Sequence, residues 1–336
     1  MIGQGHQIFV DELKRFATEV ADSRCAAIAN RLDAPLRVAV SGRRGVGRNI
    51  VAHALARAAD LRGTITVTRT PAGSAEADVD VYVVAEVVKP EDHDAITAAG
   101  RPVLAVLNKA DLIATTQPGV HPYGPTIAAR TRCARLSAHT GLPIQPMVGL
   151  LAVAALDDVV DDTLWAALQV LATRPVGHLA AELRQRLLDT LDTFGVEQAV
   201  AAIRRGATRD RTRTVLRQLS CIDEVVDQIE SLGAQVHYRR VLDAVAELET
   251  LAVTDARVGK FLARDDTVVA RMAVAVDVVE AAGLNVDRCD SAAAYLRRAR
   301  GWQRYRRGPV AGLHRACSAD IVRGSLRLWS KVGSST

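Results

Sequence analysis

A regular exchange of short apolar runs and helical stretches between residues 34 and 174 restricts the fold of this chain more than any other feature. The apolar runs are rich in β-branched residues, which is typical of buried strands. We predict strands at residues 36–40, 64–68, 79–85, 103–107 and 144–151, and helices at 50–59, 92–99, 126–140 and 157–172. Strands that alternate with helices indicate an α/β domain whose sheet is mostly parallel, with helices on both faces.

The strand signal ends at Pro175, and the rest of the chain shows helical periodicity only. We predict helices at 178–194, 196–205, 209–232, 236–251, 267–282, 292–306 and 316–329. A further helix at 8–33 precedes the first strand and is expected to pack on the all-α domain. The expected organisation is therefore an N-terminal helix (1–33), an α/β domain (34–174) and an all-α domain (175–336).

A glycine-rich turn follows the first expected strand and leads into a helix. Its residues are Gly42, Arg43, Arg44, Gly45, Val46, Gly47, Arg48 and Asn49. They keep the spacing GxxxxGK[ST] of a phosphate-binding loop, with Arg48 in place of Lys and Asn49 in place of Ser or Thr. Glycines let backbone N–H groups wrap a phosphate, and the positive end of the following helix attracts the anion. By itself, such a turn is equally consistent with an ordinary strand-to-helix connection.

A second motif, Asn108-Lys109-Ala110-Asp111, ends the fourth expected strand about 60 residues later. With the glycine-rich turn, this N-K-x-D makes residues 34–172 resemble the translation-factor-like class of P-loop GTPases. The resemblance implies that Asp111 accepts two N–H donors of guanine, while Asn108 and Lys109 hold and cover the loop. It also implies GDP or GTP as the ligand. A helix before this domain and helices after it are similar in arrangement to bacterial dynamin-like proteins, on architecture alone.

The resembled family has a third base-contacting loop, usually T-S-A, for which two positions are available. Ser137-Ala138 matches two letters of that motif but falls inside the expected helix 126–140. Val148-Gly149 lies after the turn that contains Gly141, where the small Gly149 leaves room for a base and offers its N–H. We favour Val148-Gly149, because helical periodicity outranks a two-residue match.

Several elements needed for hydrolysis are absent from the sequence. Where the family has D-x-x-G, this chain has Arg69-Thr70-Pro71-Ala72-Gly73, and only residues 61–63 separate the first helix of the domain from the next strand. Phosphoryl transfer depends on Mg²⁺ and positioned charge. These substitutions argue against bound Mg²⁺ and against efficient hydrolysis, so we expect no catalytic residues. A slow GTPase with an unusual site remains a third, less favoured interpretation.

The C-terminal end of the chain is strongly basic. Residues 291–336 contain ten Arg and Lys side chains against the single Asp320. Arg297, Arg298, Arg304, Arg306 and Arg307 form a candidate surface for an anionic membrane, nucleic acid or an acidic protein. The alternative is a solvated helix face whose arginines pair with acids of preceding helices, such as Asp277, Glu280 or Asp287.

Two functional hypotheses follow. The first is a guanine-nucleotide-binding protein with little or no hydrolysis, which regulates or assembles with a partner such as an active GTPase or a second copy of itself. The second is a nucleotide-free scaffold that acts through its basic helical end. Five dispersed cysteines without a Cys-x-x-Cys pair, and no secretory signal, lead us to expect a cytoplasmic protein, with peripheral membrane attachment as an option. We expect no metal site.

Overall fold

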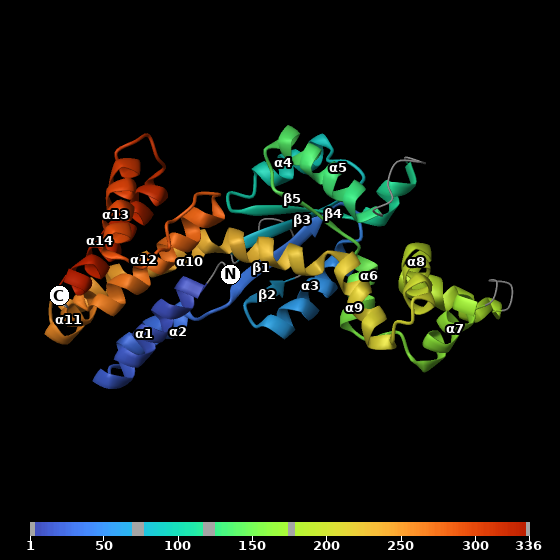
Figure 1. The fold of residues 1–336 in the computed structure, drawn as a ribbon, viewed down its shortest axis with the longest axis horizontal. Coiled ribbons are helices and arrows are strands. Elements are labelled where there is room, and N and C mark those ends of the chain that lie inside the picture. The colour runs from blue at the N-terminus through green and yellow to red at the C-terminus, as the bar shows by residue number, and fades with distance from the viewer. Residues whose placement is uncertain (1–3, 69–76, 117–124, 174–178, 334–336) are drawn as a thin grey trace. The chain divides into compact units, whose positions relative to one another are not determined.

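The computed structural model describes residues 4–68, 77–116, 125–173 and 179–333 (Figure 1). It divides the chain into two compact units. One contains Pro35–Ile229, and the other combines Met1–Ala34 with Glu230–Thr336. We call them the sheet unit and the helical unit.

In its described residues, the sheet unit is built on five strands that all run parallel, in the order β2-β1-β3-β4-β5. The strands are β1 (Leu36–Gly42), β2 (Ile65–Thr68), β3 (Val79–Ala85), β4 (Val103–Asn108) and β5 (Ile144–Met147). The central strands β3 and β4 are buried almost throughout, as expected for a parallel sheet covered on both faces. The predicted parallel α/β architecture is confirmed.

Helices cover the sheet on both sides (Figure 1). On one side, α4 (Pro90–Thr97) and α5 (Pro125–Thr140) bury Ile96 and Cys133 against Tyr82 and Val84 of β3. On the other side lies α3 (Arg48–Arg62), which contacts α6 (Gly149–Leu156). A 3₁₀ helix, η1 (Ala110–Thr116), follows β4.

The expected strand 144–151 is shorter than predicted. It ends at Met147, and its second half forms the start of α6, whose first helical hydrogen bond runs from the Ala152 N–H to the Val148 carbonyl at 3.1 Å. A continuous apolar run fits a buried strand and a buried helix equally well, so periodicity could not separate them.

Further helices complete the sheet unit: α7 (Asp162–Thr173), α8 (Ala181–Arg204), α9 (Arg209–Ser220) and residues 222–229 of α10 (Ile222–Ala252). Of these helices, α7, α8 and α9 share one apolar core with α6. In this core, Leu187 and Leu191 of α8 pack with Leu151 of α6 and Leu168 of α7. Along the chain, the division between the compact units falls between Ile229 and Glu230, whereas the sequence suggested a boundary at residue 175. Helical periodicity shows that a segment is a helix but not which core its apolar face joins.

Two breaks divide these helices. Asp192 interrupts α8 with φ 58° and ψ 176°, close to the predicted break between 194 and 196. Cys221 separates α9 from α10 with φ 58°, so the expected helix 209–232 is two helices, and α10 runs through the break predicted at 232–236.

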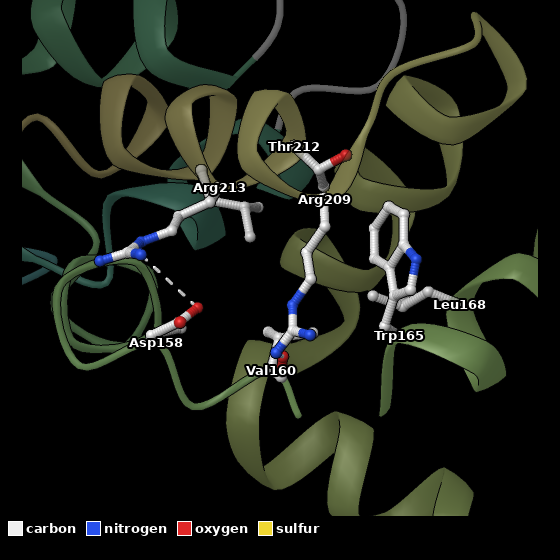
Figure 2. A pocket seen from close by; sticks show the side chains of 9 residues that line it. Asp158, Val160, Trp165, Leu168, Arg209, Thr212 and Arg213 are labelled. Carbon is white, nitrogen blue, oxygen red and sulfur yellow. Dashed lines mark hydrogen bonds and ion pairs between the residues drawn. The ribbon is translucent and has the colours of Figure 1, made fainter. Parts of the chain in front are cut away.

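A small pocket lies between α7 and α9 (Figure 2). Its volume is about 10 Å³, which is room for about one water molecule. Its cations are already bound, since Arg213 lies 3.6 Å from Asp158 and Arg209 donates to Asp162 at 2.7 Å. We therefore assign no ligand to it.

The helical unit is all-α, as expected for the C-terminal part of the chain. It contains α1 (Gln4–Val20), α2 (Ser23–Leu32), the remainder of α10, α11 (Ala256–Ala263), α12 (Asp265–Ala281), α13 (Ala292–Arg306) and α14 (Gly312–Gly333). The N-terminal helices share its core, where the rings of Phe16 and Phe261 stack at 4.3 Å and Tyr238 is fully buried.

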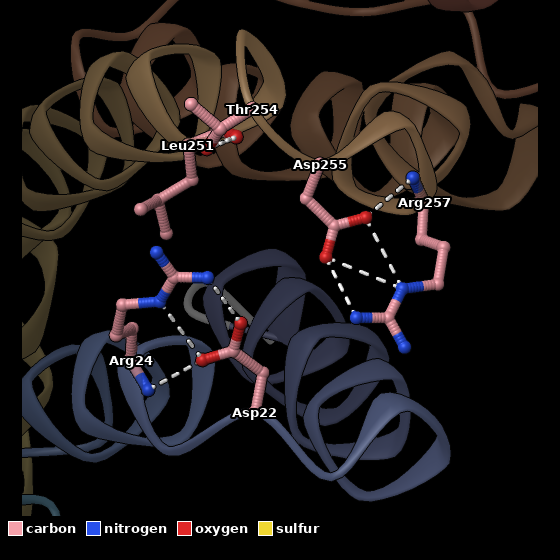
Figure 3. Close-up of polar contacts among 6 residues, drawn as sticks. All are labelled: Asp22, Arg24, Leu251, Thr254, Asp255 and Arg257. Atoms are coloured by element: carbon pink, nitrogen blue, oxygen red, sulfur yellow. Dashed lines mark hydrogen bonds and ion pairs between the residues drawn. The ribbon is translucent and has the colours of Figure 1, made fainter.

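The expected single helix 8–33 is two helices. Ala21 adopts φ 52°, and Asp22 caps α2 by accepting from the Arg24 N–H at 2.8 Å (Figure 3). Asp255 caps α11 in the same way through the Arg257 N–H at 2.9 Å. An Asp side chain that satisfies a free N–H starts a new helix where periodicity continues unbroken. Among the described residues, no helix is long and apolar enough to cross a membrane.

Two neighbouring histidines inside the helical unit, with rings tilted by 36°, lead us to expect acid sensitivity. The rings of His6 and His237 lie 3.9 Å apart, and burial lowers the pKa of His6 to about 4 and that of His237 to about 3. Unfolded histidines titrate near 6.5, so the unfolded chain binds more protons as the pH falls below that value. Between pH 7 and pH 4 we expect the pair to remove on the order of 5 kcal/mol from the free energy of unfolding.

Urea unfolding of the wild type and of a His6→Phe, His237→Phe variant at several pH values measures this effect. The variant should lose less stability on acidification. Equal losses would show that other groups dominate the acid response.

Candidate functional site

The glycine-rich turn connects β1 to α3 and needs its glycines. Gly42, Gly45 and Gly47 have φ values of 143°, 87° and 84°, which side chains disfavour. A Cβ at Gly42 would lie 2.5 Å from the Val83 carbonyl oxygen, and one at Gly47 would lie 2.3 Å from the Asn108 amide nitrogen. The Val83 backbone beside Gly42 and the Asn108 side chain beside Gly47 therefore leave room only for glycine at both ends of the turn.

The turn also lies where ligands collect in sheets of this kind. After β1 the chain places β2 on one side of it and β3 on the other, so the strand order reverses between β1 and β3. In open α/β sheets the crevice beyond the carboxyl ends of the strands, at such a reversal, is the usual ligand site.

Asn108, the last residue of β4, joins three segments. Its buried side-chain amide donates to the Val46 carbonyl at 2.9 Å, and its amide oxygen accepts from the Gly149 N–H at 3.0 Å. The structure thus brings together the glycine-rich turn, the N-K-x-D segment and the Val148-Gly149 segment. Ser137, the other candidate for the third loop, lies on α5, where its hydroxyl accepts from the Ile144 N–H at 3.1 Å.

Asp111 is a buried carboxylate at this edge of the sheet. Only 8% of its surface is exposed, and burial raises the pKa of its side chain, with charge repulsion from Asp192 of α8 adding to the effect. Its own backbone N–H donates to it, and no other residue in the described part of the chain does so. Lys109, two residues earlier, is exposed with φ 58°.

The arginines of the turn divide into two kinds. Arg43 donates to the fully buried Asp92 at 2.7 Å, and the Tyr82 hydroxyl donates to the same oxygen at 2.9 Å. The Arg43 side chain therefore holds the turn to α4. Arg44 and Arg48 are exposed, and within the described ranges neither guanidinium makes a hydrogen bond or an ion pair. Arg44 just before α3 and Arg48 at its first position are thus two cations without a partner among the described residues.

The residues of this site fit Mg²⁺ poorly. The ion prefers carboxylate, hydroxyl and water oxygens, but residues 42–49 contain no acid or hydroxyl, and only the exposed Asn49 offers a side-chain oxygen. Among the described residues, no group of three His, Cys, Asp or Glu side chains could hold a metal ion. The segment Arg69-Thr70-Pro71-Ala72-Gly73, where the family has D-x-x-G, lies outside the described residues.

The basic residues singled out near the C-terminus belong to the helical unit and do not form one uniform surface. Arg298 is buried and donates to the Ser325 hydroxyl at 2.9 Å and to the Asp287 carbonyl at 2.5 Å, so it is a structural residue. Its long apolar stem and fixed guanidinium suit this role. Arg297 is exposed and pairs with Asp287 at 3.2 Å, as the alternative interpretation proposed. The remaining three, Arg304, Arg306 and Arg307, are exposed.

One feature of the nucleotide-site candidate was not visible in the sequence. Leu187 and Leu191 of α8 belong to the same apolar core as Ala110 and Val148, and the charge of the kink residue Asp192 acts on Asp111. No local motif marks such a contact, because it joins segments about 80 residues apart.

Comparison with known proteins adds no family assignment. No protein-family model matches the chain, and no curated protein matches it. The function is therefore inferred from the geometry of the site.

Proposed function

We propose that the sheet unit binds a guanine nucleotide and hydrolyses it slowly or not at all, so that the protein acts as a regulatory or assembly partner. The buried Asp111 carboxylate carries the proposal. This carboxylate is largely buried yet accepts from no other described residue, so its oxygens keep acceptor capacity for donors that a ligand supplies. Guanine presents two adjacent N–H donors, at N1 and at the exocyclic amine, which match the two carboxylate oxygens.

The phosphate end of the proposed ligand would lie at the glycine-rich turn. The N-terminus of the 15-residue helix α3 offers free N–H groups and a positive dipole. Arg44 and Arg48 add charge that no described carboxylate neutralises. A guanidinium binds phosphate through two parallel hydrogen bonds, so these arginines support phosphate binding that does not need Mg²⁺.

The same residues argue against rapid hydrolysis. Efficient phosphoryl transfer uses a metal ion between the phosphates and a group that positions the attacking water. Residues 42–49 lack the hydroxyl that usually holds the ion, and Arg48 and Asn49 do not replace it. We therefore assign the site to binding, with cation charge supplied by the chain.

Isothermal titration calorimetry of nucleotide-stripped protein with GDP and GTP, with and without Mg²⁺, tests the proposal. We expect micromolar binding that changes less than about threefold when Mg²⁺ is removed. No heat and no thermal shift with either nucleotide would overturn it.

Asp111→Asn provides a sharper test, because it replaces one acceptor with a donor. The variant should bind GDP on the order of 100-fold more weakly, since two donors then face each other in a buried site. It should gain affinity for xanthosine diphosphate, whose carbonyl at C2 accepts from the new amide. Asp94→Asn, an exposed change on α4, is the matched control and should bind GDP like the wild type. Unaltered GDP binding by Asp111→Asn would refute a base-reading role.

The nucleotide-free scaffold is the second candidate, and one observation favours it. Asn108 and Arg43 already bind protein groups, so they hold the three loops in place without a ligand. In that case the loops keep their geometry for structural reasons, and the calorimetric titration gives no heat. Binding partners would then be sought at the helical unit.

A further inference from the structure

A groove runs along α13 in the helical unit. It has a volume of about 320 Å³ and lies between α13 and the connection that precedes it. Leu284 and Asn285 line it from the connection, and Gly301, Trp302 and Tyr305 line it from the helix. The two aromatic rings meet edge to face at 5.2 Å, and the Tyr305 hydroxyl bonds His314 Nδ1 at 3.0 Å, so this wall is rigid. Asp287, Arg297 and Arg298 also line the groove, so it combines an apolar wall with one carboxylate and two guanidinium groups.

The segment that carries the helix wall of this groove is rich in arginines and poor in acids. The chain contains no Asp or Glu between residues 291 and 319. Five exposed arginines of this segment have no carboxylate partner within the described residues: Arg300, Arg304, Arg306, Arg307 and Arg315. In contrast, Arg323 of α14 pairs with Asp320, and Arg327 pairs with Asp265. Carboxylates thus neutralise these two arginines of α14, whereas α13 keeps a net positive charge.

The helix geometry places these charges beside the groove. Successive residues turn by about 100°, so Arg300 and Arg304 lie within about 60° of Arg297, which itself lines the groove. Arg306 lies about 40° beyond Trp302, at the opposite rim. Arg297 already pairs with Asp287 inside the groove, so the charge available to a ligand comes from the arginines at its edges. A partly apolar groove with such cations at its edges is complementary to a segment that carries apolar and acidic side chains.

The helix dipole accounts for only part of this charge. Arg304 and Arg306 lie in the last turn of α13, where cations are favourable. Arg300 lies more than a turn earlier, and Arg315 belongs to the start of α14, where a cation is unfavourable. Interaction with the helix dipole therefore does not explain why Arg300 and Arg315 are present.

We propose that this groove docks an acidic peptide segment of a partner protein, with an apolar side chain against the half-buried Leu284 and Tyr305 and carboxylates paired to Arg300 and Arg304. Planar guanidinium groups suit carboxylates in two-point contacts. Single-stranded nucleic acid fits less well, because it stacks on exposed aromatic faces and Trp302 is only 8% exposed. A membrane surface needs no groove. The proposal is independent of nucleotide binding by the sheet unit.

Fluorescence anisotropy with a labelled probe peptide, Glu-Glu-Leu-Glu-Glu-Leu-Glu-Glu, tests the proposal on the full chain. We expect binding that weakens with salt and is lost when lysine replaces every glutamate. Arg300→Glu with Arg304→Glu should weaken binding at least tenfold, while Arg135→Glu on α5, an exposed arginine elsewhere, should not. Vesicles with 30% phosphatidylserine and a 20-base-pair DNA duplex are measured in parallel.

A second variant separates the groove from the charge. A Cβ at Gly301 meets no atom within 4 Å, so Gly301→Phe fills the groove while the helix and the arginines remain. This variant should also lose at least tenfold in peptide affinity. Peptide binding that Gly301→Phe leaves unchanged would overturn the proposal. So would tight binding of vesicles or DNA together with no binding of the peptide.

Discussion

Replacing Asn108 with alanine is expected to lower the free energy of unfolding of the sheet unit by about 3–5 kcal/mol. The change would leave the Val46 carbonyl and the Gly149 N–H without their partner in a buried place. Each unsatisfied buried group costs about 1–3 kcal/mol, and the lost side-chain volume adds to this. The same variant should bind no guanine nucleotide, because the glycine-rich turn would no longer be hydrogen-bonded to the N-K-x-D segment that is proposed to bind the base.

Urea unfolding followed through Trp165, which lies in the sheet unit, measures the stability. Asn49→Ala is the matched control, since Asn49 is an exposed residue of the same turn and should change stability by less than about 0.5 kcal/mol. If Asn108→Ala lost under about 1 kcal/mol, water would be replacing the amide, and the three loops would not depend on it.

The second large effect is expected in the helical unit, where Gly5→Ala should cost about 3 kcal/mol. A Cβ at Gly5 would lie 2.3 Å from the carbonyl carbon of Ala273 and 2.5 Å from the nitrogen of Val274. Both atoms belong to the backbone of α12, which cannot move aside as a flexible side chain can. The Gly5 N–H also donates to the buried Asp277 at 2.9 Å, so a displaced α1 would lose this bond too.

Unfolding followed through Trp302 and Trp329, both in the helical unit, reports this loss. Gly312→Ala is the control, because a Cβ at Gly312 meets nothing within 4 Å. Hydrogen exchange should show increased opening of α1 in Gly5→Ala. A stability equal to that of the control would mean that α1 and α12 separate at little cost.

Local patterns predicted much of the architecture correctly. The strands at 36–40, 64–68, 79–85 and 103–107 lie within a few residues of β1 to β4, because each is a short β-branched run between turn residues. One prediction failed where a single apolar run contains both a strand and the start of a helix, as at Met147. Another failed where one capping residue divides a continuous helical pattern, as at Asp22. Such breaks depend on one or two backbone angles, which periodicity does not encode.

The candidate site was predicted in part. The motif spacing grouped Gly47, Asn108 and Gly149, and the structure places these residues in contact. The motif spacing could not predict the role of each arginine, because arginine side chains take three different roles in the structure. Arg43 pairs with Asp92, Arg298 is buried against Ser325, and Arg44 is exposed and has no partner among the residues that the structure describes. The partner of a long cationic side chain depends on which acids the fold brings within reach.

The sequence by itself determined the class of the fold, the glycines of the turn and the positions of Asn108 and Asp111, because these depend on local spacing and backbone freedom. Only the tertiary structure decided that α8 and α9 belong with the sheet and that Asp111 is buried beside Asp192. It also decided that the cations of α13 border a groove. The physical reason is the sequence separation of the interacting residues. Helices and turns form from contacts between neighbours, whereas burial and ion pairing depend on residues far apart in the chain.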